Sequence, residues 1–385
     1  MKRSTSLIRP KKPTDPAAPL IEPIYETTTY VFESAEQVRQ YSEGALKKFL
    51  YSRYENPTVV AVEQRLAQAE DAAEALVFSS GMAATATALM ALLKAGDEVV
   101  CSAAIYGGTL HLLHDLLSRF GITTRFATLD ELQQPASLLG ARTRLLWFES
   151  PINPTLRCLD IRAIAGACRA NGVLSAIDNT FASPVNQQPL SHGVDLVMHS
   201  ATKYLNGHSD VTAGVIAGPA ELVQRVGRTR RLLGTILDPH PAYALGRGLK
   251  TLQVRVERQN ANAMAVARWL EQDRRVSHVY YPGLESHPDH DIARRQMTGF
   301  GGMVTIDLSG SYERAARLFD RLQVIQRAAS LGGVESLCSL PVLTSQWGHT
   351  DEQLAQAGVT RGMARLSIGL EDPDDLIADL DQALA

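Results

Sequence analysis

The residues best suited to chemistry lie between His199 and His208, where Lys203 stands among small hydroxyl side chains. An apolar run at residues 194–198 precedes them and is typical of a short buried strand. A lysine that leaves a buried strand can lose its proton to desolvation and then form a Schiff base with an aldehyde. Ser200 and Thr202 offer hydroxyl donors to an anion beside it. This combination suits pyridoxal phosphate (PLP), although an isolated segment of this kind is more often a surface lysine in a loop.

Two further segments carry residues that suit the same cofactor. Asp178 directly follows an apolar run at residues 173–177. Its carboxylate either caps a helix or pairs with a pyridine nitrogen and keeps the ring protonated. Ser80, Gly81 and Met82 precede an Ala- and Thr-rich helix, so they form a plain helix cap or hold a phosphate on free backbone N–H groups. The lysine described above favours the cofactor interpretation in both cases.

An aromatic residue and a buried cation complete the candidate site. Tyr106 precedes Gly107 and Gly108, so its ring either lies on a planar cofactor or packs in the core at a turn. Arg365 lies in a strand-like apolar stretch, where a charge is rarely buried without a partner. That partner is either the carboxylate of a substrate, held bidentately, or a carboxylate of an internal salt bridge.

The elements that must position these residues alternate between strands and helices. Helices are predicted at residues 56–69, 82–93, 110–117 and 161–170, and strands at residues 75–78, 98–101, 123–126, 144–148, 173–177, 194–198 and 214–217. This alternation predicts a mainly parallel sheet covered by helices on both faces. Ligands of such sheets bind beyond the carboxyl ends of the strands, where the polar and glycine-rich residues cluster.

The length of 385 residues suggests two domains and an arm. Residues 1–50 are rich in Pro and Thr, and we expect an extended arm that contacts a neighbouring subunit; the prolines that oppose a helix there are Pro10, Pro13, Pro16, Pro19 and Pro23. Residues 51–245 form the expected large, PLP-binding domain, and residues 246–385 the C-terminal domain. A long helix at residues 241–272 links them, followed by strands at 276–281 and 302–308 and helices at 315–322 and 373–384.

Composition excludes several classes of partner. The net charge of −3 gives no electrostatic reason to expect nucleic acid or an anionic membrane. No apolar run approaches the ~20 residues of a membrane span, and the basic first residues precede no signal-peptide core. The four cysteines form no C-x-x-C pair, so we expect neither a metal site nor disulfides, and a cytoplasmic location.

The chain resembles the trans-sulfuration (Cys/Met metabolism) family of PLP enzymes. This family includes cystathionine γ-synthase, cystathionine γ- and β-lyases, methionine γ-lyase and O-acylhomoserine sulfhydrylases. The resemblance runs from about Pro19 to the C-terminus and is specific. It rests on the motifs Tyr51-Ser-Arg-Tyr-Glu-Asn-Pro-Thr58, Ser80-Gly-Met82, Tyr106-Gly-Gly-Thr109, Glu149-Ser-Pro-Ile-Asn-Pro154, Asp178-Asn-Thr180, Ser200-Ala-Thr-Lys203, Ser330-Leu-Gly-Gly333 and Arg365-Leu-Ser-Ile-Gly-Leu-Glu371.

The resemblance implies a fold and a set of roles. The fold is that of PLP-dependent transferases of fold type I (aspartate-aminotransferase-like), with a central, mostly parallel seven-stranded sheet and a smaller α+β C-terminal domain. Lys203 carries the cofactor as a Schiff base and moves protons, Asp178 pairs with the pyridine nitrogen, and Tyr106 stacks on the ring. The other implied ligands of the cofactor are Ser80, Gly81, Met82, Asn153, Ser200 and Thr202, and those of the substrate are Asn153, Ser330 and Arg365. Tyr51 and Arg53 reach the cofactor of the neighbouring subunit, which implies a homotetramer built as a dimer of active dimers.

Some positions depart from the family's usual pattern. Ala329 stands where γ-synthases and γ-lyases usually carry Glu, near the distal end of their substrate. Leu110 and His111 replace a polar residue and Arg, and Tyr54 and Glu55 replace a small residue and Gly. We therefore expect substrates with a small or uncharged distal end to be preferred over cystathionine.

The expected activity is PLP-dependent γ-elimination or γ-replacement on sulfur-containing or O-acyl-homoserine-type amino acids. The alternatives are β-elimination by a C–S lyase and γ-replacement with a non-sulfur nucleophile. A nicotinamide-binding protein would also fit the strand–helix alternation, but no G-x-G-x-x-G follows the first strand. A catalytically silent relative is disfavoured because every expected chemical position is filled.

Overall fold

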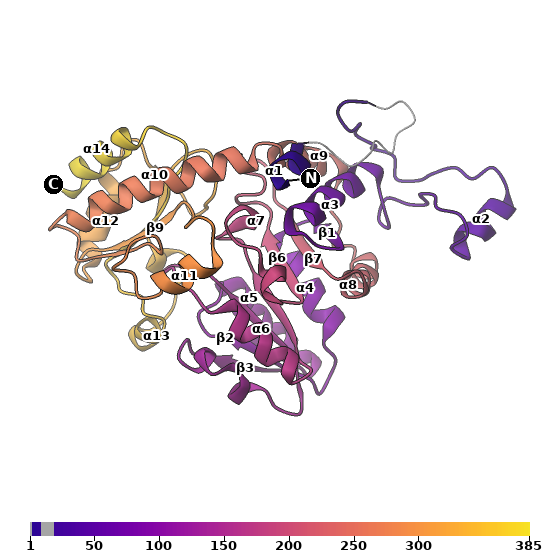
Figure 1. Ribbon diagram of the computed structural model, residues 1–385, viewed down its shortest axis with the longest axis horizontal. Coiled ribbons are helices and arrows are strands. Elements are labelled where there is room, and N and C mark those ends of the chain that lie inside the picture. The colour runs from indigo at the N-terminus through magenta and orange to yellow at the C-terminus, as the bar shows by residue number, and fades with distance from the viewer. Residues whose placement is uncertain (1, 9–18) are drawn as a thin grey trace.

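The computed structural model, which describes residues 2–8 and 19–385, contains a large and a smaller sheet (Figure 1). The large sheet has seven strands in the order β1-β7-β6-β5-β4-β2-β3. Only β7 runs against its neighbours. The strands are Glu74–Phe78 (β1), Glu98–Ser102 (β2), Thr123–Ala127 (β3), Thr143–Glu149 (β4), Leu174–Asp178 (β5), Leu196–Ser200 (β6) and Gly214–Gly218 (β7).

Helices cover both faces of the large sheet. On one face, α3 (Pro57–Glu70) and α9 (Pro239–Leu249) pack against β1 and β7, and α6 (Ile161–Ala170) packs against β4 and β5. On the other face lie α4 (Gly81–Leu92) and α8 (Ala220–Leu233). This arrangement confirms the predicted doubly covered, mostly parallel sheet.

The smaller sheet belongs to the C-terminal part of the chain and is mostly antiparallel. Its five strands lie in the order β10-β11-β12-β9-β8. They are His278–Tyr280 (β8), Met303–Asp307 (β9), Gln326–Arg327 (β10), Leu337–Ser339 (β11) and Met363–Ser367 (β12). Three helices share its core: α10 (Leu252–Gln272), α12 (Tyr312–Arg321) and α14 (Pro373–Leu384). The shorter α11 (His290–Gln296) and α13 (Asp351–Gln356) lie outside that core.

The helix predicted at residues 241–272 is instead two helices, α9 and α10, interrupted at residues 250–251. The carbonyl of Gly248 accepts hydrogen bonds from the Thr251 hydroxyl at 3.2 Å and from Arg255 Nη2 at 2.9 Å. Side chains that insert into the backbone ladder in this way interrupt a helix. The prediction of one continuous helix is therefore wrong.

The segment predicted as an extended arm contains two short helices. The first, α1 (Arg3–Ile8), packs against α3 and buries Leu7. The second, α2 (Ala35–Ser42), has no buried residue and projects from the body (Figure 1). Pro10, Pro13 and Pro16 lie outside the described residues. Exposed apolar side chains lie in and before α2, including Val38 (42% exposed) and Val31 (84% exposed).

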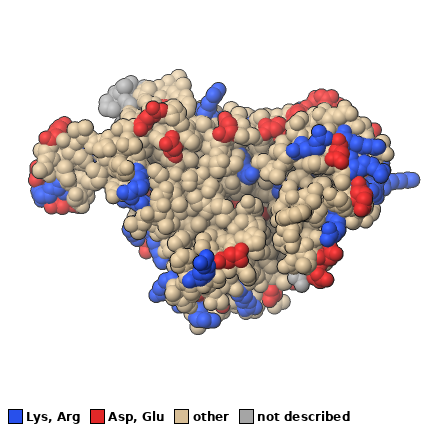
Figure 2. Space-filling model, turned by 180° about the vertical axis from the view of Figure 1, so that it is seen from behind, with Lys and Arg blue, Asp and Glu red and all other residues tan. Residues whose placement is uncertain are grey.

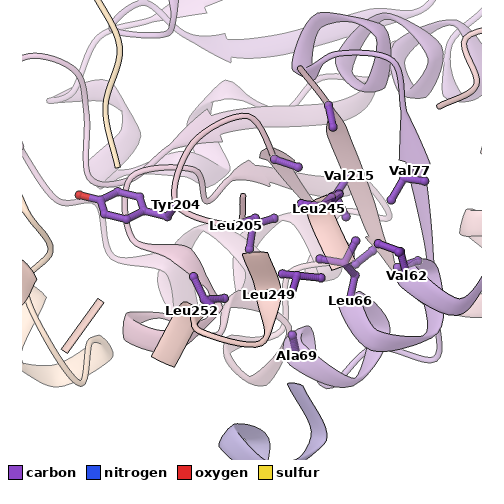
Figure 3. Close-up of a cluster of buried hydrophobic side chains, with 14 of the residues drawn as sticks. Val62, Leu66, Ala69, Val77, Tyr204, Leu205, Val215, Leu245, Leu249 and Leu252 are labelled. Atoms are coloured by element: carbon purple, nitrogen blue, oxygen red, sulfur yellow. The ribbon is translucent and has the colours of Figure 1, made fainter. Parts of the chain in front are cut away.

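Figure 3 shows the core that supports the candidate site. Tyr204 and Leu205, which follow Lys203, pack with Leu249 and Leu252 in one buried cluster. The Tyr204 hydroxyl also accepts a hydrogen bond from the N–H of Gly302 at 3.1 Å, just before β9. The turn that carries the lysine is thus anchored where the two sheets approach each other.

The surface charges are mixed in sign, in line with the small net charge of −3. On the face shown in Figure 2, acidic and basic side chains are interspersed rather than separated into broad fields of one sign. None of the described helices is long and apolar enough to cross a membrane.

Candidate active site

The parallel strands β1, β2, β4, β5 and β6 end at one edge of the large sheet, and candidate residues lie at or after each of these ends. Glu149 and Asp178 are the last residues of β4 and β5 and are paired in register. Ser200 ends β6 and is paired with Gly214 of β7, which is also paired with the last residue of β1. The structure therefore brings the predicted segments together at the carboxyl edge of the sheet.

Lys203 lies in the turn after β6, where its N–H donates to the carbonyl of Ser200 at 3.1 Å. Its Nζ donates to Ser330 Oγ at 3.0 Å. Burial, and secondly the positive charge of Arg365, lower the pKa of Lys203. A larger fraction of this amine is therefore neutral and nucleophilic than in an ordinary lysine.

The N-terminus of α4 offers free N–H groups that suit a phosphate and is called the phosphate cradle below. Ser80 caps the helix by accepting the N–H of Ala83 at 3.0 Å, whereas the N–H groups of Gly81 and Met82 make no hydrogen bond within the described residues. A Cβ atom at Gly81 would lie 3.0 Å from both Cβ and Oγ of Ser200, so any larger residue would crowd this serine. Free N–H groups at a helix N-terminus beside a serine hydroxyl fit a phosphate.

Thr202 lies beside this cradle but uses its hydroxyl within the protein. The hydroxyl donates to the carbonyl of Ala213 at 3.2 Å and accepts from the N–H of Ala213 at 2.9 Å. Thr202 thereby holds the turn after β6 against the segment that leads into β7.

Asp178 is buried at the end of β5 and accepts the N–H of Thr180 at 3.0 Å. It caps no helix, because the next helix, α7 (Ser183–Asn186), has Ala182 at its N-cap. Burial raises the pKa of Asp178, and the bond to Thr180 and the nearby His199 oppose that rise. A buried carboxyl of this kind suits a pyridinium nitrogen, whose positive charge would stabilise the ionised form.

Tyr106 directly precedes α5 (Gly107–His111) and is 48% exposed, so it is not a core tyrosine. Gly108 leaves room for its ring. A Cβ at Gly108 would lie 2.6 Å from Cε1 of Tyr106 and 2.9 Å from Sδ of Met82. The ring thus lies beside the helix end that forms the phosphate cradle, and it remains accessible to a planar ligand.

Arg365, on β12, is buried, and its guanidinium forms no ion pair within the described residues. Nη1 donates to Oδ1 of Asn153 at 2.9 Å, and Nη2 donates to the carbonyl of Ser330 at 3.2 Å. Burial lowers the pKa of Arg365 to about 10. Since the internal salt bridge considered from the sequence is absent there, this cation is available for the carboxylate of a ligand.

The sequence reasoning gave no role to Glu149, although it lies at a strand end like the others. Its carboxyl is 3% exposed and accepts the N–H of Tyr106 and the N–H of Asn153, each at 3.1 Å. Burial, together with the charge of Asp178, raises the pKa of Glu149 to about 8. Two signals could have pointed to it: its position at the end of an apolar run, and its place at the start of the motif Glu149-Ser-Pro-Ile-Asn-Pro154.

The structure does not bring Tyr51 and Arg53 into this cluster. Arg53 donates to the carbonyl of Arg231 at 2.7 Å and stacks over the rings of Tyr51 and Tyr54. Tyr51 is 39% exposed at the base of the projecting segment. Both residues remain available to a neighbouring subunit.

The residues that depart from the family's pattern lie in varied surroundings. Ala329 is exposed beside Ser330, whereas Leu110 packs against the apolar core around α4. His111 pairs with Asp115 at 3.0 Å, and Glu55 pairs with Arg231 at 2.9 Å. Of these departures, Ala329 has the most direct connection with the site.

A desolvated lysine, free N–H groups at a helix N-terminus, a buried carboxyl and an accessible aromatic ring at one sheet edge define a PLP-dependent enzyme of the α/β class. The Cys/Met metabolism PLP-dependent enzyme family matches residues 4–385. The chain belongs to this family, and the predictions of its fold, its cofactor and its enzymatic nature are confirmed.

Named relatives agree with this assignment. The chain is 41% identical over 363 residues to cystathionine gamma-synthase 1, chloroplastic, of Nicotiana tabacum, covering 94% of this chain and 67% of that protein. It is 40% identical over 374 residues to L-methionine gamma-lyase of Pseudomonas putida, covering 97% and 94%. The solved structure of cystathionine gamma-lyase from Lactobacillus plantarum, complexed with L-serine, matches with a TM-score of 0.93 at 36% identity and covers 100% of this chain and 98% of that chain.

Proposed function

We propose that this enzyme catalyses γ-elimination or γ-replacement on sulfur-containing or O-acyl-homoserine-type amino acids. The observation that carries the proposal is the chain of contacts from Lys203 Nζ to Ser330 Oγ, and from Ser330 O through Arg365 to Asn153. It links the amine that would carry the cofactor to the cation that would hold the substrate carboxylate. An α-amino acid bound to that cation would present its Cα–H close to the amine.

Each residue has a proposed role. PLP, when bound, withdraws electrons from the substrate and stabilises the carbanion left after proton removal. Lys203 Nζ would attach the cofactor and then take and return protons. Asp178 would keep the pyridine nitrogen protonated, and Tyr106 would cover the ring. Gly81 and Ser200 would hold the phosphate, together with Ser80 and Met82. Thr202, predicted as a further ligand, would donate to the phosphate in place of its present bond to the Ala213 carbonyl.

Two departures from the family's usual pattern, Ala329 and Leu110, support a preference for substrates with a small or uncharged distal end. Ala329 offers no carboxylate for a distal ammonium, and Leu110 offers no polar group. Homocysteine, methionine and O-acetyl-homoserine would satisfy such a pocket better than cystathionine, whose distal amino-acid end needs charged partners. Relatives named as a gamma-synthase and gamma-lyases support the γ-position as the reacting one, and a relative named cystathionine beta-lyase, also 40% identical, supports the alternative of β-elimination.

Product analysis tests this proposal. The purified enzyme with PLP is incubated with homocysteine, methionine, O-acetyl-homoserine, O-succinyl-homoserine and cystathionine, with and without an added thiol. We expect 2-oxobutanoate without the thiol and a new thioether with it, most rapidly from the substrates with small ends. Pyruvate from cystathionine would instead establish β-elimination, and a wide preference for cystathionine would contradict the proposed pocket.

We further propose that the enzyme works as a homotetramer of active dimers in the cytoplasm. Tyr51 and Arg53 lie outside the cluster of candidate site residues of their own chain. Apolar side chains around α2 are exposed, as expected of groups that contact a neighbouring subunit. All four cysteines are free and buried, which suits a reducing compartment.

Subunit mixing tests the shared site. Arg53→Ala subunits are mixed with Lys203→Ala subunits, each nearly inactive alone. If Arg53 serves the partner's site, a mixed dimer has one site with both lesions and one with neither, and part of the activity returns. No recovery, with exchange verified by mass, would show that each site is built from one chain.

A further inference from the structure

One carboxyl joins two loops that no proposed role has yet connected. Oε2 of Glu149 accepts the backbone N–H of Tyr106, and Oε1 accepts the backbone N–H of Asn153, both at 3.1 Å. The first N–H belongs to the loop after β2 and the second to the loop after β4. Glu149 itself is fixed as the last residue of β4, in register with Asp178.

Each loop has other ties of its own, such as the bond from the Thr305 hydroxyl to the Pro154 carbonyl at 2.7 Å, but Glu149 bonds to both loops. Tyr106 is the N-cap residue of α5 and makes no side-chain cap bond, and its own N–H is held by Glu149. The side-chain oxygen of Asn153 accepts a hydrogen bond from Arg365. The backbone N–H of Asn153 bonds to Glu149 and thereby holds Asn153 close to the end of β4. Glu149 thereby fixes the ring of Tyr106 on one side and the Asn153–Arg365 pair on the other.

We propose that Glu149 is a positioning residue that holds Tyr106 and Asn153 at a fixed separation across the cofactor site. The inference rests on the function proposed above, because it assigns Tyr106 to the cofactor ring and Arg365 to the substrate carboxylate. Burying a second carboxyl beside Asp178 is unfavourable in itself, as the raised pKa of Glu149 indicates. The two N–H bonds offset part of that cost.

Glu149→Gln keeps the shape of the side chain but presents an amide NH2 to one of the two N–H donors. One of the two hydrogen bonds is therefore lost, and a buried N–H is left without an acceptor. We expect kcat/KM to fall about ten- to hundredfold, with changes in both kcat and KM. Glu149→Asp, whose shorter side chain cannot span both loops, should cause a similar fall.

Asp379→Asn is the matched control. Asp379 is also a buried carboxyl that accepts backbone N–H groups, those of Gln323, Val324 and Ile325, at 2.8–2.9 Å. It lies in α14, in the core of the smaller sheet. This variant should lose thermal stability without changing the visible circular dichroism of bound PLP, which reports the orientation of the cofactor.

The experiment compares that dichroism and kcat/KM for Glu149→Gln, Tyr106→Phe, Arg365→Lys and the double variants. Glu149→Gln should change the dichroism of the resting enzyme, and its effects should be less than multiplicative with both partner substitutions. Multiplicative effects in both cycles, or an unchanged dichroism in Glu149→Gln and Glu149→Asp alike, would overturn the proposal. The dichroism needs no substrate, so this failure is distinct from a failure of the proposed reaction.

Discussion

Replacing Arg365 by lysine tests the geometry of the substrate end of the site. The guanidinium bonds to Asn153 Oδ1 at 2.9 Å and to the Ser330 carbonyl at 3.2 Å, and its remaining N–H groups are available for a carboxylate. A lysine keeps the charge, but its single ammonium cannot reach both protein acceptors and hold a carboxylate bidentately. The substitution therefore separates the effect of charge from that of geometry.

The expected magnitude follows from the bonds that are lost. At least one charge-assisted bond to the protein and one to the substrate disappear, at about 1.5–3 kcal/mol each. Lysine regains part of this loss, so we expect a net cost of roughly 3–4 kcal/mol. This corresponds to a fall in kcat/KM of about 10²–10³-fold.

The assay compares methionine with 3-(methylthio)propylamine, which lacks the carboxylate. The unaltered enzyme should strongly favour methionine, and Arg365→Lys should reduce that preference together with kcat/KM. The control is Arg65→Lys, since Arg65 is equally buried and bonds to the Gly246 carbonyl at 3.0 Å and to Glu22 at 2.7 Å. An undiminished preference for methionine in Arg365→Lys would refute the assignment of Arg365 to the substrate carboxylate.

Further predictions concern charges in the site. Asp178→Asn should keep the fold but cut turnover by orders of magnitude, because an amide cannot keep the pyridine nitrogen protonated; near-normal kinetics would contradict this role. The rate at which the apoprotein captures PLP covalently should rise with pH, with a midpoint below 10.5, because the pKa of Lys203 is lowered. In Arg365→Met that midpoint should move to higher pH, and an unmoved midpoint would contradict the influence of the arginine charge. Between pH 4.5 and about 8 the folded apoprotein keeps the proton of Glu149 while the unfolded chain has lost it. Glu149 should therefore lower the free energy of unfolding with rising pH in this window, by up to about 1.4 kcal/mol per pH unit from this group, and Glu149→Gln should reduce the slope measured by urea titration. Ala329→Glu should shift kcat/KM toward cystathionine by roughly ten- to hundredfold, and no shift would place recognition of the distal end elsewhere.

Much of the fold could be predicted because the sheet is built from short, continuous apolar runs. Each of the seven strands of the large sheet overlaps the range predicted from the sequence, with ends that differ by at most two residues. Ligands of parallel sheets bind beyond the carboxyl ends of the strands. This general observation was enough to predict that Asp178, Ser200 and Lys203 lie at one edge of the large sheet, without any knowledge of contacts. The local sequence pattern was sufficient to predict a strand wherever the burial of its apolar side chains alone determines its position.

Other features depend on contacts between distant segments and leave no local signal. The break between α9 and α10 arises from Arg255, which reaches back to the carbonyls of Gly248 and Tyr204 at 2.9 Å. Glu149 accepts an N–H from Tyr106, 43 positions earlier in the chain. Neither spacing nor hydropathy reports which backbone group a buried side chain will meet.

The most direct test of the account is to locate the cofactor on the chain. The holoenzyme is reduced with borohydride, digested, and its peptides are mapped by mass spectrometry, with Lys203→Ala treated in parallel. We predict a phosphopyridoxyl group on Lys203, none in the variant, and loss of turnover in the variant. A reduced cofactor on any other lysine, or retention of a covalently attached cofactor in Lys203→Ala, would contradict the account.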